Sequence, residues 1–127
     1  MSEKKKYFWK DDADIGSYDF CYNEAGDYDF YINEVAVHYN RGWTEEERQR
    51  RFKGAKFVWG GCAGGVSYSN KPLEADNIED AKKEFEAWYE QYLADCIENL
   101  KKRMEAITKE YEVFLAYKEG DHYSSDN

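Results

Sequence analysis

Long apolar runs are absent from this chain of 127 residues. No stretch approaches the roughly 18 apolar residues of a membrane-spanning helix, and the basic first ten residues lack the apolar run of a signal peptide. We therefore expect no membrane contact and a cytoplasmic protein, in the cytoplasm of the host cell if the chain is phage-encoded.

Cysteine and histidine are scarce. Cys21, Cys62 and Cys96 are odd in number and form no CxxC pair, which argues against a disulfide framework or a zinc site. One of the two histidines, His38, lies in the sheet-like region. A third interpretation is an enzyme with Cys62 as nucleophile and His38 as base. Such a dyad requires the two side chains to meet in space. We expect a non-enzymatic protein with no cofactor and no metal.

Positive charge is missing from one segment. The net charge is −9, and residues 11–34 hold eight carboxylates and no Lys or Arg. A surface of this sign repels a phosphate backbone, so direct binding to nucleic acid is not expected.

Aliphatic residues are also few. The core therefore depends on 12 tyrosines, 7 phenylalanines and 4 tryptophans, each able to bury about 150–250 Å².

A short internal repeat predicts a β-hairpin. The segment YDFCYNE at residues 18–24 recurs as YDFYINE at residues 28–34, with NEAGD supplying turn residues between them. Aromatic residues alternate with Asp in both copies, so Asp19 and Asp29 should share the outward face with Cys21 and Tyr31. The apolar parity then changes at residues 35–39. Either a bulge at residues 33–34 or a tight turn into a third strand explains the change, and we favour a meander.

Two helices are predicted after this region. Thr44 can cap a short helix near residues 45–53, which should end at Gly54. Residues 57–59 and 66–68 are strand-like. Asn77 or Asp76 can cap a long helix near residues 77–117, within which there is no Gly or Pro. The expected fold class is α+β: an N-terminal antiparallel meander of about four to five strands, with the N-terminal half of the long helix packed on it. Residues 1–120 should form one domain, and residues 121–127 a polar disordered tail.

The long helix is too long for its own domain. Forty residues span about 60 Å, whereas a compact domain of this size is nearer 36 Å across. Its apolar positions follow steps of 4, 4, 3, 4, 4, 3, 4 and 4 from Phe85, an eleven-residue rhythm that predicts a nearly straight seam. Either the helix breaks near Asn99 or another chain covers the stripe. We favour a homo-oligomer, a dimer first, whose interface comprises Leu100, Met104, Ile107, Tyr111 and Leu115.

The acidic segment gives the main functional hypothesis. Carboxylates a few ångströms apart on a rigid hairpin are similar in charge density to a nucleic-acid backbone, and interleaved Tyr adds contact area. The expected function is a non-enzymatic inhibitor that occupies a basic, nucleic-acid-binding surface of a partner protein. Its partner-binding residues would be Asp12, Asp14, Asp19, Glu24, Asp27, Asp29, Tyr31 and Glu34. In composition alone, the chain resembles phage anti-defence proteins, including anti-CRISPR inhibitors that mimic DNA.

The glycine cluster GGCAGG supports an alternative from another class. A homo-oligomer could bind or sequester a small anionic ligand such as a nucleotide, with backbone donors from Gly60, Gly61, Gly64 and Gly65 and charge from Arg48 and Arg51. The cluster lacks the lysine and the following helix of a phosphate-binding loop. A hairpin with a bulge explains the same glycines without a ligand.

Overall fold

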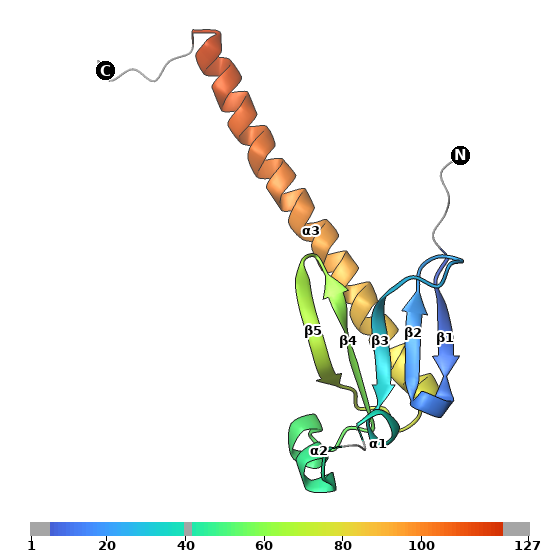
Figure 1. Ribbon diagram of the computed structural model, residues 1–127. Coiled ribbons are helices and arrows are strands. Elements are labelled where there is room, and N and C mark those ends of the chain that lie inside the picture. Colours follow the sequence, from blue (N-terminus) through green and yellow to red (C-terminus); the bar gives the residue numbers. More distant parts are fainter. Residues whose placement is uncertain (1–5, 40–41, 121–127) are drawn as a thin grey trace. The chain divides into compact units, whose positions relative to one another are not determined.

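The fold is a five-stranded antiparallel sheet followed by a long helix (Figure 1). This computed structural model describes residues 6–39 and 42–120, so the predicted tail at residues 121–127 lies outside the described residues. The strands are β1 (Phe8–Asp12), β2 (Ser17–Cys21), β3 (Tyr28–Glu34), β4 (Phe57–Ala63) and β5 (Val66–Pro72), in the spatial order β1-β2-β3-β4-β5. The helical elements are η1 (Ala13–Ile15), α1 (Val35–His38), α2 (Glu45–Phe52) and α3 (Ile78–Lys118). The predicted α+β meander is confirmed.

The chain divides into two compact units, Met1–Ala87 and Trp88–Asn127. The first unit holds the whole sheet, the short helices and the first turns of α3. In the second unit, the described residues belong to the rest of α3 and the turn after it. Helix α3 is assigned as one unbroken element through Asn99, so the predicted alternative of a break at that residue is not observed.

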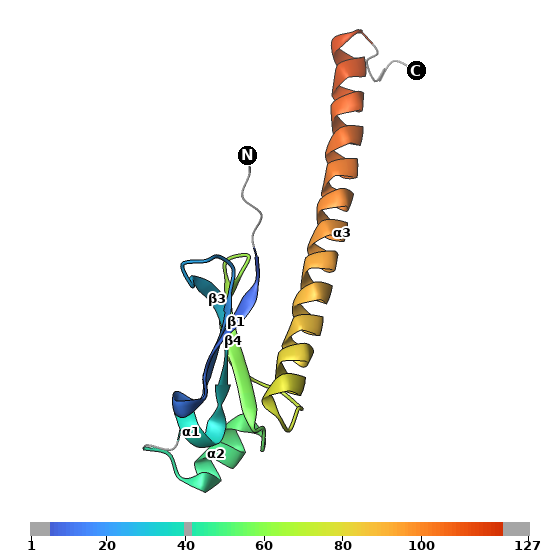
Figure 2. The same ribbon diagram turned by 90° about the vertical axis from the view of Figure 1, so that its right-hand side faces the viewer.

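The main core of the first unit lies between one face of the sheet and the start of α3 (Figure 2). Phe85 is fully buried, and its ring centroid lies 5.2–5.9 Å from those of Trp9, Phe20, Phe30 and Trp59. The strand register places these four partners on the same face. Burial of a Phe side chain contributes about 1.5–3 kcal/mol. The alternating aromatic pattern of the sequence thus builds the face that receives α3.

A smaller core lies on the other side of the sheet, where Val35, Phe52 and Val58 are buried together and Tyr39 packs against them. Here one expectation is wrong. Residues 35–39 do not form a strand, because β3 ends at Glu34 and a single turn of helix, α1, follows. The Val35 amide donates to the Lys56 carbonyl and the Tyr39 amide to the Val35 carbonyl, which turns the chain away from the sheet.

The starts of α2 and α3 follow the predicted capping chemistry. The Glu47 amide donates to Thr44 Oγ1 over 3.1 Å at the start of α2, and the Asp80 amide donates to Asn77 Oδ1 over 2.9 Å at the start of α3. Helix α2 ends at Phe52, two residues before the predicted glycine, because Lys53 takes the left-handed conformation with φ of 54°.

The connection between β5 and α3 is held by one side chain of the helix. The Glu84 carboxylate accepts hydrogen bonds of 2.9–3.0 Å from the backbone amides of Glu74 and Ala75. Because the two amides belong to the segment that enters α3, this contact fixes where the helix begins relative to the end of β5.

Candidate functional site

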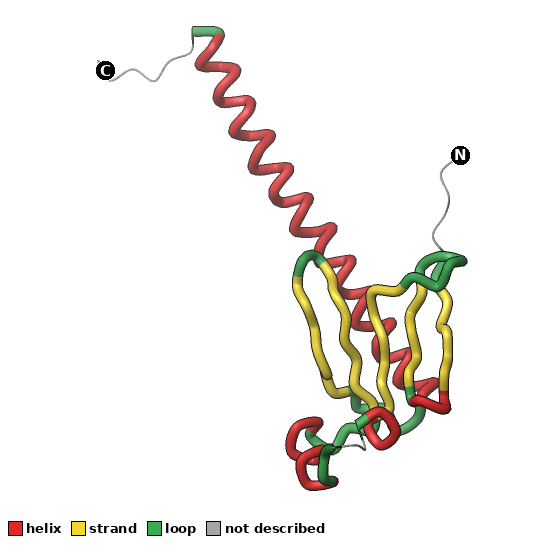
Figure 3. The backbone as a smooth tube through the Cα atoms, in the orientation of Figure 1, coloured by secondary structure: helices red, strands yellow, loops and turns green. Residues whose placement is uncertain are grey.

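The acidic segment occupies both ends of strands β1 to β3. Asp12 ends β1 and Asp14 lies in η1, which connects β1 to β2. Glu34 belongs to the same end, because its amide donates to the Gly16 carbonyl over 2.7 Å. The turn from β2 to β3 holds Glu24 and Asp27 at the other end (Figure 3). The sequence-predicted site residues thus form two acidic ends of one hairpin.

Asp29 is the second residue of β3, beside that second end, and Asp19 lies between the two ends, in the middle of β2. Asp19 has Lys10 directly opposite it on β1 and Tyr31 opposite it on β3. Burial raises the pKa of the half-buried Asp19 carboxyl, Lys10 lowers it, and Asp12 raises it again. The sequence pattern does not show that a lysine would face Asp19, so the middle of this surface is less acidic than its ends.

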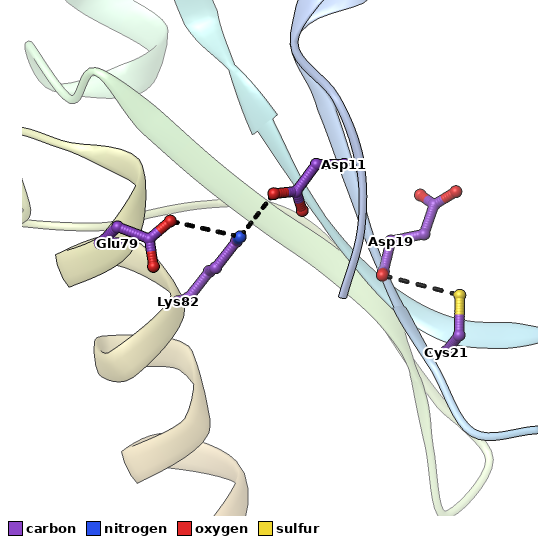
Figure 4. Close-up of polar contacts among 5 residues, drawn as sticks. All are labelled: Asp11, Asp19, Cys21, Glu79 and Lys82. Carbon is purple, nitrogen blue, oxygen red and sulfur yellow. Dashed lines mark hydrogen bonds and ion pairs between the residues drawn. The ribbon is translucent and has the colours of Figure 1, made fainter. Parts of the chain in front are cut away.

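The environment of Cys21 differs from the expected one. The sequence placed this thiol on the outward face beside Asp19, but Cys21 is fully buried beneath the turn after β2. Its Sγ lies 3.5 Å from the carbonyl oxygen of Gly26. The carbonyl oxygen of Asp19 lies 3.7 Å from the same sulfur (Figure 4). A register shift between Phe20 and Cys21 accompanies this burial. Burial raises the pKa of the Cys21 thiol, and the Asp19 charge raises it further.

Most of these carboxylates form no ion pair within the part of the chain that the structure describes. Asp11 is bonded to Lys82, whereas the other seven carboxylates of residues 11–34 form no ion pair with any residue that the structure describes. Five of the seven, Asp12, Asp14, Glu24, Asp27 and Asp29, are exposed. An exposed and unpaired acidic surface attracts a basic macromolecule over about 10 Å at moderate salt.

A polar cluster that sequence reasoning missed lies where α1 meets the sheet. Ser17 Oγ donates to Asn33 Oδ1 over 3.3 Å and lies 3.4 Å from His38 Nδ1. Asn33 Nδ2 donates to the Tyr39 hydroxyl, which in turn donates to Asn70 Oδ1. These contacts join α1 to β2, β3 and β5. The alternation of apolar residues at positions 35–39 suggested a strand, so the sequence pattern did not indicate this cluster.

The glycine cluster forms a hairpin. Gly64 and Gly65 form the turn between β4 and β5, both with positive φ (57° and 80°), as a two-residue turn requires. Gly60 and Gly61 lie within β4, where a Cβ would overlap the Tyr31 ring above Gly60 and the Asp29 carbonyl above Gly61. Turn conformation or close packing therefore explains all four glycines without a ligand, and no helix begins at the turn.

The structure does not bring the predicted arginines to these glycines. Arg48 and Arg51 lie on α2, near the start of β4, whereas the glycine turn follows its end (Figure 1). Both arginines contact Trp43: Arg48 Nη1 donates to its carbonyl over 2.9 Å, and the Arg51 guanidinium lies 4.5 Å from its ring centroid. Within one chain, therefore, these arginines and glycines lie at different ends of β4.

A hollow of about 520 Å³ lies beside α2. It is lined by cations and carboxylates together, Arg48 and Lys56 against Glu34, Glu45 and Asp76 among others. Mixed charge of this kind gives no preference for an anionic or a cationic ligand, so the hollow does not define a site.

The thiol and imidazole of the enzyme interpretation contact different partners. Cys62 Sγ lies 3.6 Å from Ser67 Oγ across the end of the β4–β5 hairpin, whereas His38 contacts Ser17 at α1. Within residues 6–39 and 42–120, no three His, Cys, Asp or Glu side chains are grouped so that they could hold a metal ion.

None of the helices in the described ranges combines the length and the apolar character needed to cross a membrane. Comparison of the chain with protein-family models, with curated proteins and with solved structures finds no match in any of the three.

Proposed function

We propose that this protein is a non-enzymatic binding protein of the cytoplasm that places its acidic β1–β3 region on a basic surface of a partner protein. The observation that carries the proposal is the set of seven carboxylates without an ion-pair partner among the described residues. Three adjacent strands support these charges on a rigid frame, so little order is lost on binding.

Inhibition of a nucleic-acid-binding protein is the outcome that this chemistry favours. A groove that binds a phosphate backbone carries a high density of Lys and Arg, and carboxylates at both ends of the β2–β3 hairpin compete for the same cations. The half-buried Tyr31 between them adds an aromatic contact of the kind that interfaces favour. The proposed class is therefore an acidic inhibitor, as in phage anti-defence and anti-CRISPR systems.

The test begins with affinity capture from the native host and continues with the captured protein in purified form. The binding constant is measured from low to high salt for the native chain and for Asp12→Lys/Asp29→Lys, which reverses one exposed carboxylate at each end of the hairpin. We expect tight binding at low salt, a steep loss at high salt, and binding by the variant that is weaker by at least tenfold.

The matched control is Glu98→Lys/Glu112→Lys. It changes the net charge equally but alters exposed positions of α3 in the second unit. We expect this control to bind within about threefold of the native chain, since long-range effects of net charge are small once screened. Salt-independent affinity, or equal loss in the two variants, would contradict the proposal.

A further inference from the structure

The second unit carries exposed apolar side chains that follow a heptad repeat. Seven residues are spaced by 4, 3, 4, 3, 4 and 3 along α3: Leu93, Ile97, Leu100, Met104, Ile107, Tyr111 and Phe114. All seven are exposed, from 43% at Leu93 to 67% at Met104. Alternating steps of four and three are the heptad pattern of a coiled coil. The eleven-residue seam omitted Ile97 and Phe114 and used Cys96 and Leu115 instead.

The heptad fixes the role of every other position. Ile97, Met104 and Tyr111 take position a, and the other four apolar residues take position d. The outward positions b, c and f are Asp95, Glu98, Asn99, Lys102, Glu105, Ala106, Lys109, Glu112, Val113 and Ala116. Most are charged, and Glu98 with Lys102 and Glu105 with Lys109 have the favourable spacing for pairs within one helix. This part of α3 is therefore polar on one side and has an apolar stripe on the other, against which a second helix can pack.

The flanking positions decide which helix fits. Position e holds Ala94, Lys101, Thr108 and Leu115, and position g holds Cys96, Arg103, Glu110 and Tyr117. In a parallel pair, each g residue faces the e residue five places on in the partner. Arg103 would then face Thr108 of the partner subunit, and Glu110 would face Leu115 of the partner subunit. No opposite charges meet in that arrangement.

An antiparallel pair gives a different result, because g then faces g and e faces e. With the twofold axis between residues 105 and 106, the layers are Ile97 with Phe114 of the partner subunit, Leu100 with the partner's Tyr111, and Met104 with the partner's Ile107. In this register Arg103 faces Glu110 of the partner subunit, and the symmetry repeats the pair. Ala94 faces Leu115 of the partner subunit, so two apolar flanks also meet.

Other antiparallel registers bring like charges together. A shift of one heptad in one direction places Arg103 against Arg103 of the partner subunit and Lys101 against Lys101 of the partner subunit. A shift in the other direction places Glu110 against Glu110 of the partner subunit. Since flanking charges select orientation and register in coiled coils, a single arrangement is favoured.

We propose that residues 93–118 form an antiparallel two-helix coiled coil with a second copy of this chain, with Met104 and Ile107 at its centre. The six core positions from Ile97 to Phe114 are then covered over about 27 Å of helix. The inference is independent of the proposed function. It also gives each assembly two acidic β1–β3 regions, which raises the effective affinity for a partner with two basic sites.

The first test is the mass of the full-length protein in solution, measured by sedimentation equilibrium at two salt concentrations. We expect a dimer. Arg103→Glu and Glu110→Arg each replace two attractive pairs with two repulsive ones and should each weaken dimerisation by about tenfold. Arg103→Glu/Glu110→Arg exchanges the charges and should restore native affinity. Equal losses in the single and double variants would overturn the register.

Ile107→Glu is the variant for the apolar core, and Val113→Glu is its matched control at the outward position c. The first should be monomeric and the second dimeric, with equal thermal unfolding of the sheet, because both side chains are exposed within one chain. A native protein that stays monomeric to roughly 1 mM would overturn the proposal and assign the apolar stripe to the helix of another protein.

Orientation is tested by the distance between the two Cys96 residues. In the Cys62→Ser background a spin label is attached to Cys96, since Cys21 is fully buried. Antiparallel helices in the stated register separate the two Cys96 positions by 19 residues along the axis, roughly 28 Å. Parallel helices hold them at one level, with axes about 8–10 Å apart. A pulsed electron paramagnetic resonance distance of the shorter kind would overturn the antiparallel pair.

Discussion

The Lys82 ammonium group lies 2.8 Å from the Asp11 carboxylate and joins the first turns of α3 to strand β1 (Figure 4). Lys82 is buried, with 8% of its surface exposed, and Glu79 lies 3.5 Å from the same ammonium group. Burial lowers the pKa of Lys82, but the hydrogen bond and the charge of Asp11, with those of Glu79, outweigh burial and raise it. The pair holds one end of the helix against the sheet.

Asp11→Asn should lower the free energy of unfolding by about 1–3 kcal/mol, because a buried ammonium group loses the charge that compensates its burial. Urea unfolding followed by tryptophan fluorescence measures the change. Asp12→Asn is the control, since Asp12 is on the same strand, exposed and not bonded to Lys82; it should stay within about 0.5 kcal/mol of the native chain. Equal losses in the two variants would show that the ion pair is not the cause.

The raised pKa of Lys82 also predicts a pH dependence. The folded-state pKa lies above the ordinary value of 10.5, so folding favours the protonated amine. Its contribution to stability is therefore complete below pH 10.5 and is lost as the pH rises through the folded-state value. Lys82→Met, which keeps the apolar stem, should show a smaller loss of stability than the native chain between pH 9 and pH 12 in thermal unfolding scans. Parallel curves for the two proteins would contradict the assignment.

Thiol reactivity should separate the two cysteines of the sheet. In the Cys96→Ser background we expect one thiol, the exposed Cys62, to react rapidly with a disulfide reagent at pH 8. Cys21 should react only as the protein unfolds, because burial both excludes the reagent and keeps the thiol protonated. A kinetic trace at increasing urea measures this. Cys62→Ser should remove the fast phase, and a fast phase that survives would show that Cys21 is accessible.

The sequence predicts the parts of this fold whose pattern is local. The repeat at residues 18–24 and 28–34 has the period of two that a strand requires, and it forms β2, β3 and the turn between them. The caps at Thr44 and Asn77 lie within three residues of the amides that they bind, so they too are readable from sequence. Both helices begin where these caps predict.

Contacts between distant residues are not readable in the same way. Val35, Val37 and Tyr39 alternate as a strand would, yet α1 forms because Val35 packs with Phe52 and Val58 from other elements. Lys82 is separated from Asp11 by 71 residues, and no spacing rule links them. The acidic ends of the hairpin are predictable from the turns that hold them, whereas Lys10 opposite Asp19 depends on strand β1, which no alternation indicates.

Gly60→Ala should destabilise the sheet by about 1–3 kcal/mol, although Gly60 has no positive φ. A Cβ at this position would overlap the Tyr31 phenol and lie 2.9 Å from the Tyr68 carbonyl oxygen. Urea unfolding of Gly60→Ala in the native and Tyr31→Leu backgrounds forms a double-mutant cycle. The cost should be smaller in the Tyr31→Leu background and should not vanish, since the carbonyl oxygen remains. A cost that is the same in both backgrounds would exclude the ring as its source.

Replacement of two phenylalanines of α3 should change the stability of the sheet by very different amounts. Phe85 is fully buried among four aromatic rings, so Phe85→Ala removes the centre of the main core and should cost about 3–5 kcal/mol in urea unfolding. Phe114 is 57% exposed, and Phe114→Ala should leave the unfolding of the sheet within about 0.5 kcal/mol of the native value.

Self-association reverses the order of the two variants. Phe114 occupies position d of the proposed coiled coil opposite Ile97 of the partner subunit, so Phe114→Ala should weaken dimerisation by at least tenfold at unchanged stability of the sheet. Sedimentation equilibrium at a temperature where Phe85→Ala is still folded compares the two. Because the helix segment at residues 93–118 lies outside the unit that Phe85 stabilises, the folded Phe85→Ala protein should dimerise normally. If instead each variant loses both stability and dimerisation, folding of the sheet and association through the apolar stripe are coupled, which would contradict the prediction.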